Sequence, residues 1–264
     1  MKVLFACGSH PRHAYIARKL YDTGLLSGLI IEDRHNHVPP PPSDISEHLK
    51  DLFQHHFNIR NKSELAFFGE TEFPQVTSCH IQADELNGAK VHHMIQSIEP
   101  DLFISYGVHM IHPMTLSLLK GEMWNIHGGL SPWYRGCITH FWPSYFLEPQ
   151  MTGMTIHQLT DALDAGPVVH QNAAPMIRGD GLHDVACRAV KGCADELHSL
   201  VSLVQNKGTI EKHEHTTSGR IWRAKDWQPA HLSLIYDTYN DQIVDRYLDG
   251  DFDIKQPKLV RQFN

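Results

Sequence analysis

Long hydrophobic runs are missing from this 264-residue sequence. No run approaches the roughly 18 apolar residues that a membrane-spanning helix needs, so we expect no membrane partner. The opening stretch MKVLFACGSHPRH lacks the long apolar segment and the small-residue cleavage site of a signal peptide. It favours a first buried strand instead.

Cysteine is scarce, and its pattern argues against two kinds of site. The five cysteines are scattered, odd in number and never arranged as C-x-x-C: Cys7, Cys79, Cys137, Cys187 and Cys193. We therefore expect neither a disulfide framework nor a zinc site, and we predict a protein of the reducing cytoplasm.

An excess of basic residues is also missing, since the formal net charge is −7. Affinity for nucleic-acid phosphates requires a basic face, so we expect no nucleic-acid partner. Histidine, by contrast, occurs 21 times. The pairs His55-His56 and His92-His93 lie in polar, helix-like stretches without a third ligand at metal spacing. We interpret both pairs as solvated surface, and we expect no metal.

Strand and helix patterns alternate along the first two thirds of the chain. The apolar run at 2–8, a helical pattern up to Tyr21 and the apolar run at 26–32 form a βαβ unit with a right-handed crossover. Further buried strands are expected at 101–107, from Met151 and from Pro167. The pattern predicts an α/β fold with a Rossmann-like, open, mostly parallel sheet flanked by helices.

Three further stretches have helical character. Residues 46–69 predict an amphipathic helix, residues 138–150 an aromatic-rich helix, and residues 181–205 a long helix that ends the main domain. We expect residues 1–205 to form the catalytic domain. Residues 206–264 predict a small helical or irregular C-terminal extension that acts as a cap or a subunit contact.

The turn after the first strand, CGSHPRH, is not a G-x-G-x-x-G dinucleotide fingerprint. Ser9, His10 and Arg12 could nevertheless meet a phosphate or a sugar at the start of the following helix. A capped, solvated turn explains these residues equally well.

Two segments contain the residue types needed for acyl transfer. The first, WNIHGGLSPWYRG at 124–136, supplies Asn125 and His127, and the second, at 159–170, supplies Asp164. An amide can donate to a developing oxyanion, an imidazole can take a proton, and a carboxylate can hold the imidazole or a water. Taken singly, these residues would fit polar strand ends and a turn.

The stretch NIHGGLSPWYRG resembles the signature of the folate-dependent formyltransferases, and TGMTIHQLTDALDAGPVV resembles a second block of that family. The resemblance covers residues 102–171 well and implies 10-formyltetrahydrofolate as co-substrate. It assigns Asn125 and His127 to the oxyanion and the formyl group, with His127 as base. Asp164 would tune His127 or relay the proton through water.

The same resemblance implies two sets of binding residues. The backbone after the strand at 101–107 would contact the pterin ring, with Val108 and Met110 lining its pocket. The predicted folate-binding residues are Tyr106, Gly107, Val108, His109, Met110, Ile111, Leu159, Asp161 and Leu163. The predicted acceptor-binding residues are Ser9, His10, Arg12, Gly128, Gly129, Trp133, Tyr134 and Arg135. Gly128 and Gly129 stand where the family often has proline and serine, which leaves the shape of the acceptor side open.

Elimination points to a small-molecule amine as acceptor. Methionyl-tRNA formyltransferases carry a further basic domain, which we do not expect in an acidic chain of this length. Formyltetrahydrofolate hydrolases carry an extra N-terminal domain, whereas the first strand is expected at residue 2 here. Glycinamide ribonucleotide enzymes carry a glycine-rich loop, from which CGSHPRH departs. We therefore expect an amino sugar, nucleotide-linked and destined for a surface glycan such as lipopolysaccharide. An amino acid or peptide amine, or a folate-binding or sugar-binding protein without catalysis, remain alternatives. By analogy with the family we expect a homodimer.

Overall fold

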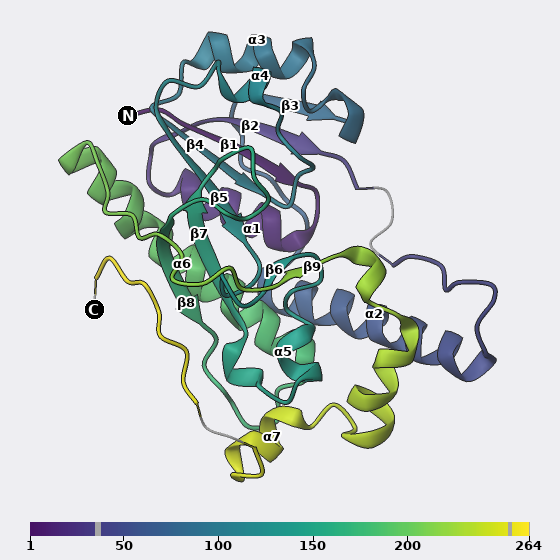
Figure 1. The fold of residues 1–264 in the computed structure, drawn as a ribbon. Coiled ribbons are helices and arrows are strands. Elements are labelled where there is room, and N and C mark those ends of the chain that lie inside the picture. The colour runs from purple at the N-terminus through teal and green to yellow at the C-terminus, as the bar shows by residue number, and fades with distance from the viewer. Residues whose placement is uncertain (35–37, 253–254, 264) are drawn as a thin grey trace.

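A computed structural model describes residues 1–34, 38–252 and 255–263. Its centre is a seven-stranded sheet in the order β3-β2-β1-β4-β5-β7-β8 (Figure 1). In that order the strands are Ser78–Ile81, Leu26–Glu32, Val3–Gly8, Leu102–Tyr106, Glu122–His127, Gly153–Gln158 and Val168–Ala173. The first five are parallel to one another, and β7 is antiparallel to both β5 and β8. The predicted Rossmann-like, mostly parallel sheet is confirmed.

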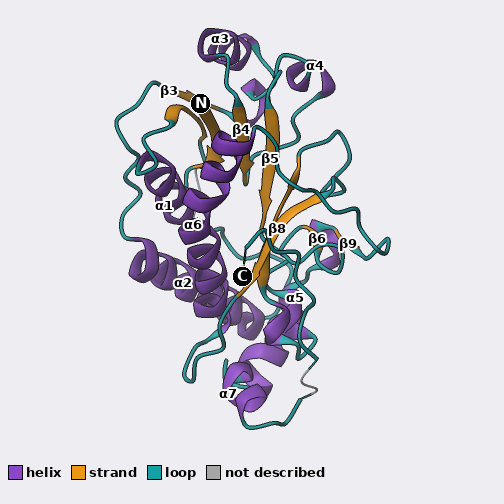
Figure 2. Ribbon diagram, turned by 90° about the vertical axis from the view of Figure 1, so that its left-hand side faces the viewer, coloured by secondary structure: helices purple, strands orange, loops and turns teal. Residues whose placement is uncertain are grey.

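Helices cover both faces of this sheet. On one side lie α1 (Pro11–Tyr21), α2 (Glu47–Phe68) and α6 (Leu182–Lys207), which Figure 2 shows gathered together. On the other lie α3 (Ala89–Ile98) and α4 (Pro113–Leu116). Within the described residues, no helix is both long enough and apolar enough to span a membrane.

The side chains of β5 alternate between the two faces of the sheet. Trp124 and Ile126 belong to the core under α1 and α6. Because successive side chains of a strand point to opposite faces, Asn125 and His127 point to the face covered by α3. Asn125 and His127 are thereby placed on one side of the sheet, away from the larger core.

The aromatic-rich helix predicted for 138–150 is wrong in extent. Only α5 (Trp142–Tyr145) and a 3-10 turn at Pro149–Met151 form there. Ile138 and Leu147 both have left-handed backbone angles, with φ of 57° and 60°, and these interrupt a right-handed helix on either side of α5.

The C-terminal extension returns to the main body after α6. Its strand β9 (Ile221–Trp222) pairs in parallel with β6 (Arg135–Gly136). Short turns follow at Ala224–Asp226, Pro229–His231 and Leu234–Thr238, and then α7 at Ile243–Leu248.

The end of the chain lies along β8, the outer strand of the sheet. The Gln171 N–H donates to the Val260 carbonyl at 2.7 Å, and the Gln262 N–H to His170 Nδ1 at 3.1 Å. The tail thereby covers an edge that would otherwise expose unpaired backbone groups. The division at residue 205 stays a prediction, although α6 runs two residues beyond it.

The expectation that both histidine pairs lie on solvated surface is wrong for His56 in α2. His55 is exposed, but His56 is buried, with its ring 4.4 Å from that of His183 in α6. The Tyr236 hydroxyl lies 2.8 Å from His56 Nδ1. Neighbouring residues of a helix point about 100° apart, so one histidine of a pair can face the core while the other faces water.

Burial of these imidazoles predicts how stability depends on pH. Burial, more than nearby charge, lowers the pKa of His56 from 6.5 to about 3 and that of His140 to about 4, and it also lowers the pKa of His183. The unfolded chain binds protons there below about pH 6.5, whereas the folded chain excludes them. The stability that these neutral imidazoles contribute is therefore fully present above about pH 6.5, and it is lost as the pH falls toward 4.

His56→Gln should flatten this dependence. We expect the slope of the unfolding free energy between pH 6.5 and 5 to fall by about 1 kcal/mol per pH unit, because one proton uptake by the unfolded chain is removed. Denaturant titrations at several pH values measure the slope. His55→Gln, on the exposed side of the same helix, is the matched control and should leave it unchanged. Equal slopes in His56→Gln and the unaltered protein would contradict the explanation.

Candidate active site

Three neighbouring strands bring polar side chains to one place on the α3 face. Register pairs Asn125 of β5 with Ser105 of β4 on one side and with His157 of β7 on the other. His127 follows two residues later on the same face of β5. His157 was missed in the sequence, although its place in the alternating stretch MTIHQL would have put it beside Asn125 once the register was known.

The amide of Asn125 is held in one orientation. The Ser105 hydroxyl donates to Asn125 Oδ1 at 2.8 Å. His157 Nδ1 lies 2.9 Å from the Gln158 carbonyl, which can only accept, so in the neutral ring His157 Nε2 is the acceptor. Asn125 Nδ2 donates to that nitrogen at 3.1 Å and lies 3.5 Å from Asp164 Oδ1. One N–H is therefore committed, and the other has only a long contact and can turn to a ligand.

His127 has one nitrogen committed as a donor. Its Nε2 lies 2.7 Å from the Tyr134 carbonyl, so Nε2 carries the proton in the neutral ring. Its Nδ1 lies 3.4 Å from Asp164 Oδ2. A proton taken up by His127 must therefore arrive at Nδ1, where the carboxylate stabilises the resulting cation.

Burial and charge set the protonation of this pair. Burial lowers the pKa of His127, and the pull of Asp164 and of the Tyr134 carbonyl offsets this only in part. Burial alone would raise the pKa of Asp164, but His127, His157 and the backbone N–H of Gly136 hold it well below its ordinary value. At neutral pH the site therefore holds a neutral imidazole beside a carboxylate, which is suited to accepting a proton from an amine.

The loop predicted to contact the pterin follows β4. Met110 is 60% exposed, and the side chain of Leu163, on the second predicted loop, is 48% exposed. Val108 and Leu159, one from each loop, pack on the same apolar cluster under α3. Contact of these residues with folate stays a prediction, but the two loops present open apolar surface above a common support.

A buried carboxylate fixes this loop. Glu32, at the end of β2, accepts from the His109 backbone N–H at 2.9 Å and lies 2.7 Å from His109 Nδ1. The Arg34 guanidinium lies 2.8 Å from the same carboxylate and donates to the Gly107 carbonyl at 2.9 Å.

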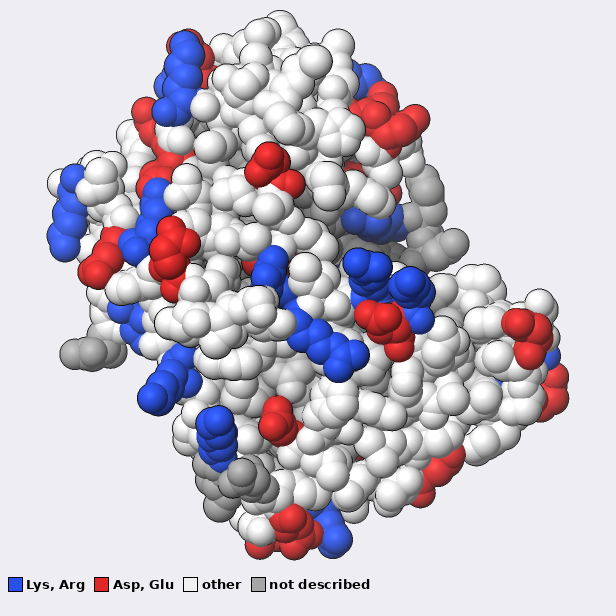
Figure 3. All heavy atoms as spheres, viewed as in Figure 1, with Lys and Arg blue, Asp and Glu red and all other residues white. Residues whose placement is uncertain are grey.

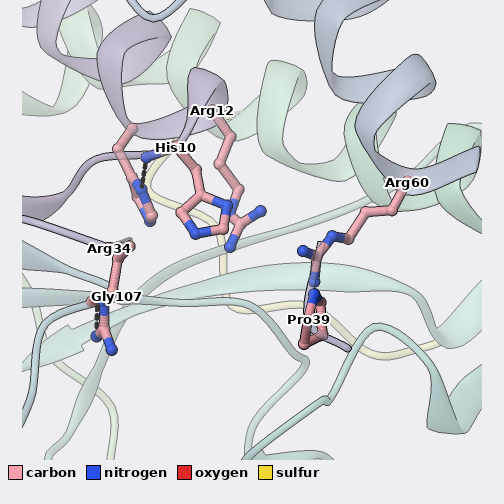
Figure 4. A pocket seen from close by; sticks show the side chains of 7 residues that line it. His10, Arg12, Arg34, Pro39, Arg60 and Gly107 are labelled. Atoms are coloured by element: carbon pink, nitrogen blue, oxygen red, sulfur yellow. Dashed lines mark hydrogen bonds between the residues drawn. The ribbon is translucent and has the colours of Figure 1, made fainter. Parts of the chain in front are cut away.

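The acceptor-side residues predicted near the first strand surround a cavity of about 350 Å³ at the carboxyl ends of β1, β2 and β4. It is lined by His10, Arg12, His13, Arg34, Pro39, Arg60 and Gly107. Figure 4 shows Arg12 and Arg60 reaching toward one another from two helices, with Arg34 beside Gly107. Ser9 supports the rim, since its hydroxyl accepts from the Arg34 N–H at 2.8 Å.

Arg34 and Arg60 were not singled out in the sequence. They lie in segments distant from the first turn, and only the fold brings them to the cavity. The carboxyl ends of parallel strands are where ligands bind in open α/β sheets, particularly where the strand order reverses, as it does between β1 and β4.

The acceptor-side residues predicted at 128–135 lie differently. Trp133 is 37% exposed, whereas Tyr134 and Arg135 are buried. The Tyr134 hydroxyl donates to Glu148 at 3.0 Å, and the Arg135 guanidinium donates to the carbonyls of Ser218 and Leu163. A substitution of Gly128 would meet the His140 ring, and one of Gly129 would meet Tyr134 and His127. Substrate contact by this group stays a prediction.

No group of three His, Cys, Asp or Glu side chains that could hold a metal ion occurs in the part of the chain that the structure describes. The cluster around Asn125 offers an amide, an imidazole and a carboxylate.

The geometry predicts how Asp164 affects His127. The pKa of His127 should lie below its ordinary value, and Asp164→Asn should lower it further, because the carboxylate that favours the imidazolium is removed. An NMR titration of the histidine ring signals measures both values, with His127→Asn identifying the signal by its absence. A rise of the His127 pKa in Asp164→Asn would contradict the arrangement.

Comparison with known proteins finds a family match over the segment that contains Asn125, His127 and Asp164. Residues 55–197 match the sequence model of the family described as formyl transferase. Phosphoribosylglycinamide formyltransferase of Escherichia coli (strain K12) is 32% identical over 126 residues, which are 47% of this chain and 58% of that protein. The chain thus spans little more than half the length of this relative.

Solved structures share the fold. A sugar N-formyltransferase from Shewanella sp FDAARGOS_354 superposes with a TM-score of 0.56 at 16% identity, covering 89% of this chain and 87% of that one. Phosphoribosylglycinamide formyltransferase from Anaplasma phagocytophilum gives 0.55 at 17% identity, with 84% and 98% covered. An N-formyltransferase from Helicobacter canadensis, solved with folinic acid and dTDP-3-aminofucose, gives 0.53 at 15% identity, with 86% and 73% covered. Since the family's sequence model matches more than half of the chain, this protein belongs to the folate-dependent formyltransferase family.

Proposed function

We propose that this protein transfers a formyl group from 10-formyltetrahydrofolate to the primary amine of an amino sugar that carries an anionic, nucleotide-linked group. The observation that carries the proposal is the arginine-lined cavity at the carboxyl ends of β1, β2 and β4, the same edge of the sheet on which β5 ends with His127. Guanidinium groups match phosphate oxygens in charge and geometry. A phosphorylated acceptor would lie in the cavity with its amine turned toward Asn125.

The charges around the cavity support an anionic ligand. Arg12 forms an ion pair with the buried Glu64 of α2. Burial and then the charge of Arg12 lower the pKa of Arg60 to about 10, because two like charges lie close together in a partly desolvated place. A bound phosphate or pyrophosphate would relieve that repulsion. Figure 3 shows basic and acidic side chains mixed over one face, with several Lys or Arg side chains near its middle.

The reaction uses the residues in separate roles. The amine nitrogen attacks the formyl carbon, a new C–N bond forms, and the bond to N10 of the folate breaks. Asn125 donates its uncommitted N–H to the oxygen as that atom gains negative charge. His127 takes the amine proton at Nδ1, where Asp164 stabilises the imidazolium. The same proton is then returned to N10 as the bond between N10 and the formyl carbon breaks, which leaves His127 neutral again.

A second acceptor class is an amine linked to a phosphoribosyl group. Identity to a phosphoribosylglycinamide formyltransferase supports it, and the cavity fits one phosphate as well as two. The turn CGSHPRH after β1 weighs against it, since it lacks the glycine-rich loop expected there. An amino acid or peptide amine has less support, because it supplies no phosphate for the arginines.

An acceptor panel separates these classes. We expect tetrahydrofolate release from 10-formyltetrahydrofolate with nucleotide-linked amino sugars, and none with free amino sugars or amino acids. Asn125→Ala should lower kcat by about 100- to 1,000-fold, because an oxyanion donor is lost. Turnover with glycinamide ribonucleotide alone would favour the second class, and turnover with amino acids alone would refute the anionic acceptor.

The cavity is tested by Arg60→Met. The KM for the phosphorylated acceptor should rise about 10- to 100-fold, since charge-assisted hydrogen bonds are lost, while the KM for the folate stays unchanged. Lys62→Met, an exposed charge on the same helix, is the matched control and should change neither value. Equal behaviour of Arg60→Met and Lys62→Met would show that the cavity does not bind the acceptor.

A further inference from the structure

The segment 134–136 contacts His127 at one end and Asp164 at the other. The carbonyl of Tyr134 accepts from His127 Nε2 at 2.7 Å, and the N–H of Gly136 donates to Asp164 Oδ2 at 2.9 Å. Between them, Arg135 donates through one terminal nitrogen to the Leu163 carbonyl at 2.7 Å. Residues 134–136 therefore set the position of the imidazole, of the carboxylate and of the backbone that carries the carboxylate.

The backbone at Asp164 has an uncommon conformation. Its φ of 44° lies in the left-handed region, which is uncommon for residues other than glycine. The Leu163 carbonyl that Arg135 holds belongs to the peptide unit just before this residue. A displacement of that peptide would move the carboxylate relative to His127 Nδ1.

The other end of the Arg135 fork reaches the C-terminal extension. Its second terminal nitrogen donates to the Ser218 carbonyl at 3.1 Å. The Arg135 N–H donates to the Arg220 carbonyl at 3.3 Å, and the Cys137 N–H to the Trp222 carbonyl at 2.8 Å. Arg135 is 9% exposed, so its guanidinium joins these two backbone segments inside the protein.

The extension is itself anchored where it meets residues 134–136. Trp222 is 4% exposed, and its ring stacks on that of Trp142 in α5 at 4.3 Å and 20°. Gly136 has a φ of 95°, and a side chain there would collide with the Trp222 carbonyl. A side chain at Gly219 would likewise collide with the Pro132 carbonyl. The two segments lie too close for any residue but glycine at these points.

We infer that Arg135 is a positioning residue, which links the C-terminal extension at Ser218 to the Leu163–Asp164 peptide and thereby holds Asp164 against His127. The inference rests on the proposed function for its kinetic consequence, but not for its structural one. It gives the extension a role in the catalytic site of its own chain. It also gives Arg135 an internal role, whereas the sequence predicted a contact with the acceptor.

The test uses Arg135→Met in the full chain, with Lys225→Met as the matched control. Met has a similar length but no donor, and Lys225 is an exposed charge in the same C-terminal segment. We expect kcat to fall about 100-fold in Arg135→Met, since misplacement of about 1 Å at a reacting group has this effect. The KM for the acceptor should stay unchanged, because the arginine-lined cavity is not altered, and amide hydrogen exchange in residues 161–166 should become faster. Lys225→Met should match the unaltered protein in all three measurements.

A double-mutant cycle distinguishes positioning from a general loss of structure. In an Asp164→Asn background, Arg135→Met should lower kcat by only about two- to threefold, because the carboxylate that it positions is gone. Arg135→Lys keeps the charge but cannot reproduce the fork, so an intermediate loss is expected. This variant decides the question if Arg135→Met does not fold.

Two results would overturn the inference. One is an unchanged kcat in Arg135→Met, or in Arg135→Lys if only that variant folds. The other is a loss of kcat of the same size with and without Asp164. If the unaltered protein transfers formyl to no acceptor, the proposed function fails, and hydrogen exchange then decides alone. Faster exchange in 161–166 would uphold the positioning role, and unchanged exchange would refute it.

Discussion

The hydrogen bond from His127 Nε2 to the Tyr134 carbonyl determines the chemistry of the whole site. A backbone carbonyl can only accept, so it fixes the tautomer of the ring and leaves Nδ1 as the nitrogen that takes a proton. That nitrogen lies 3.4 Å from Asp164 Oδ2. Burial lowers the pKa of His127, so the imidazole is neutral at neutral pH. The carbonyl in turn depends on the turn at 134–136, which pairs with β9 from the far end of the chain.

Buried carboxylates perform a second function in this molecule, which is to hold basic side chains in place. Glu32 contacts Arg34 and His109, and Glu64 contacts Arg12. A buried ion pair adds little net stability, but it fixes direction. Here the two carboxylates hold arginines at the rim of one cavity, and Glu32 also fixes the loop expected to meet the folate. The expected acceptor side and the expected folate side therefore share the contacts of Glu32.

Local patterns were sufficient for the sheet and for part of the site. The apolar runs predicted the buried strands, and the two short motifs singled out Asn125, His127 and Asp164, which the fold brings together. His157, Arg34 and Arg60 could not be found this way, because their role depends on strand register and on the approach of distant segments. No local pattern distinguishes such a residue from a solvated one.

The errors have the same origin. His56 is buried because α6 and the Tyr236 segment cover that side of α2, which the polar composition around it does not indicate. The aromatic residues after Gly136 are typical of a buried helix, but left-handed backbone angles at Ile138 and Leu147 interrupt it. The aromatic side chains between these two residues pack on the C-terminal extension. Long-range packing overrides local preference in both places.

The most direct test of the account is a crystal structure with folinic acid and a nucleotide bound together. We expect the pterin between the loops at 107–111 and 159–163, with N10 facing Asn125 and His127. The phosphates of the nucleotide should lie among Arg12, Arg34 and Arg60. A folate bound away from Asn125, or phosphates outside the arginine-lined cavity, would contradict the claim that these two places form one formyl-transfer site.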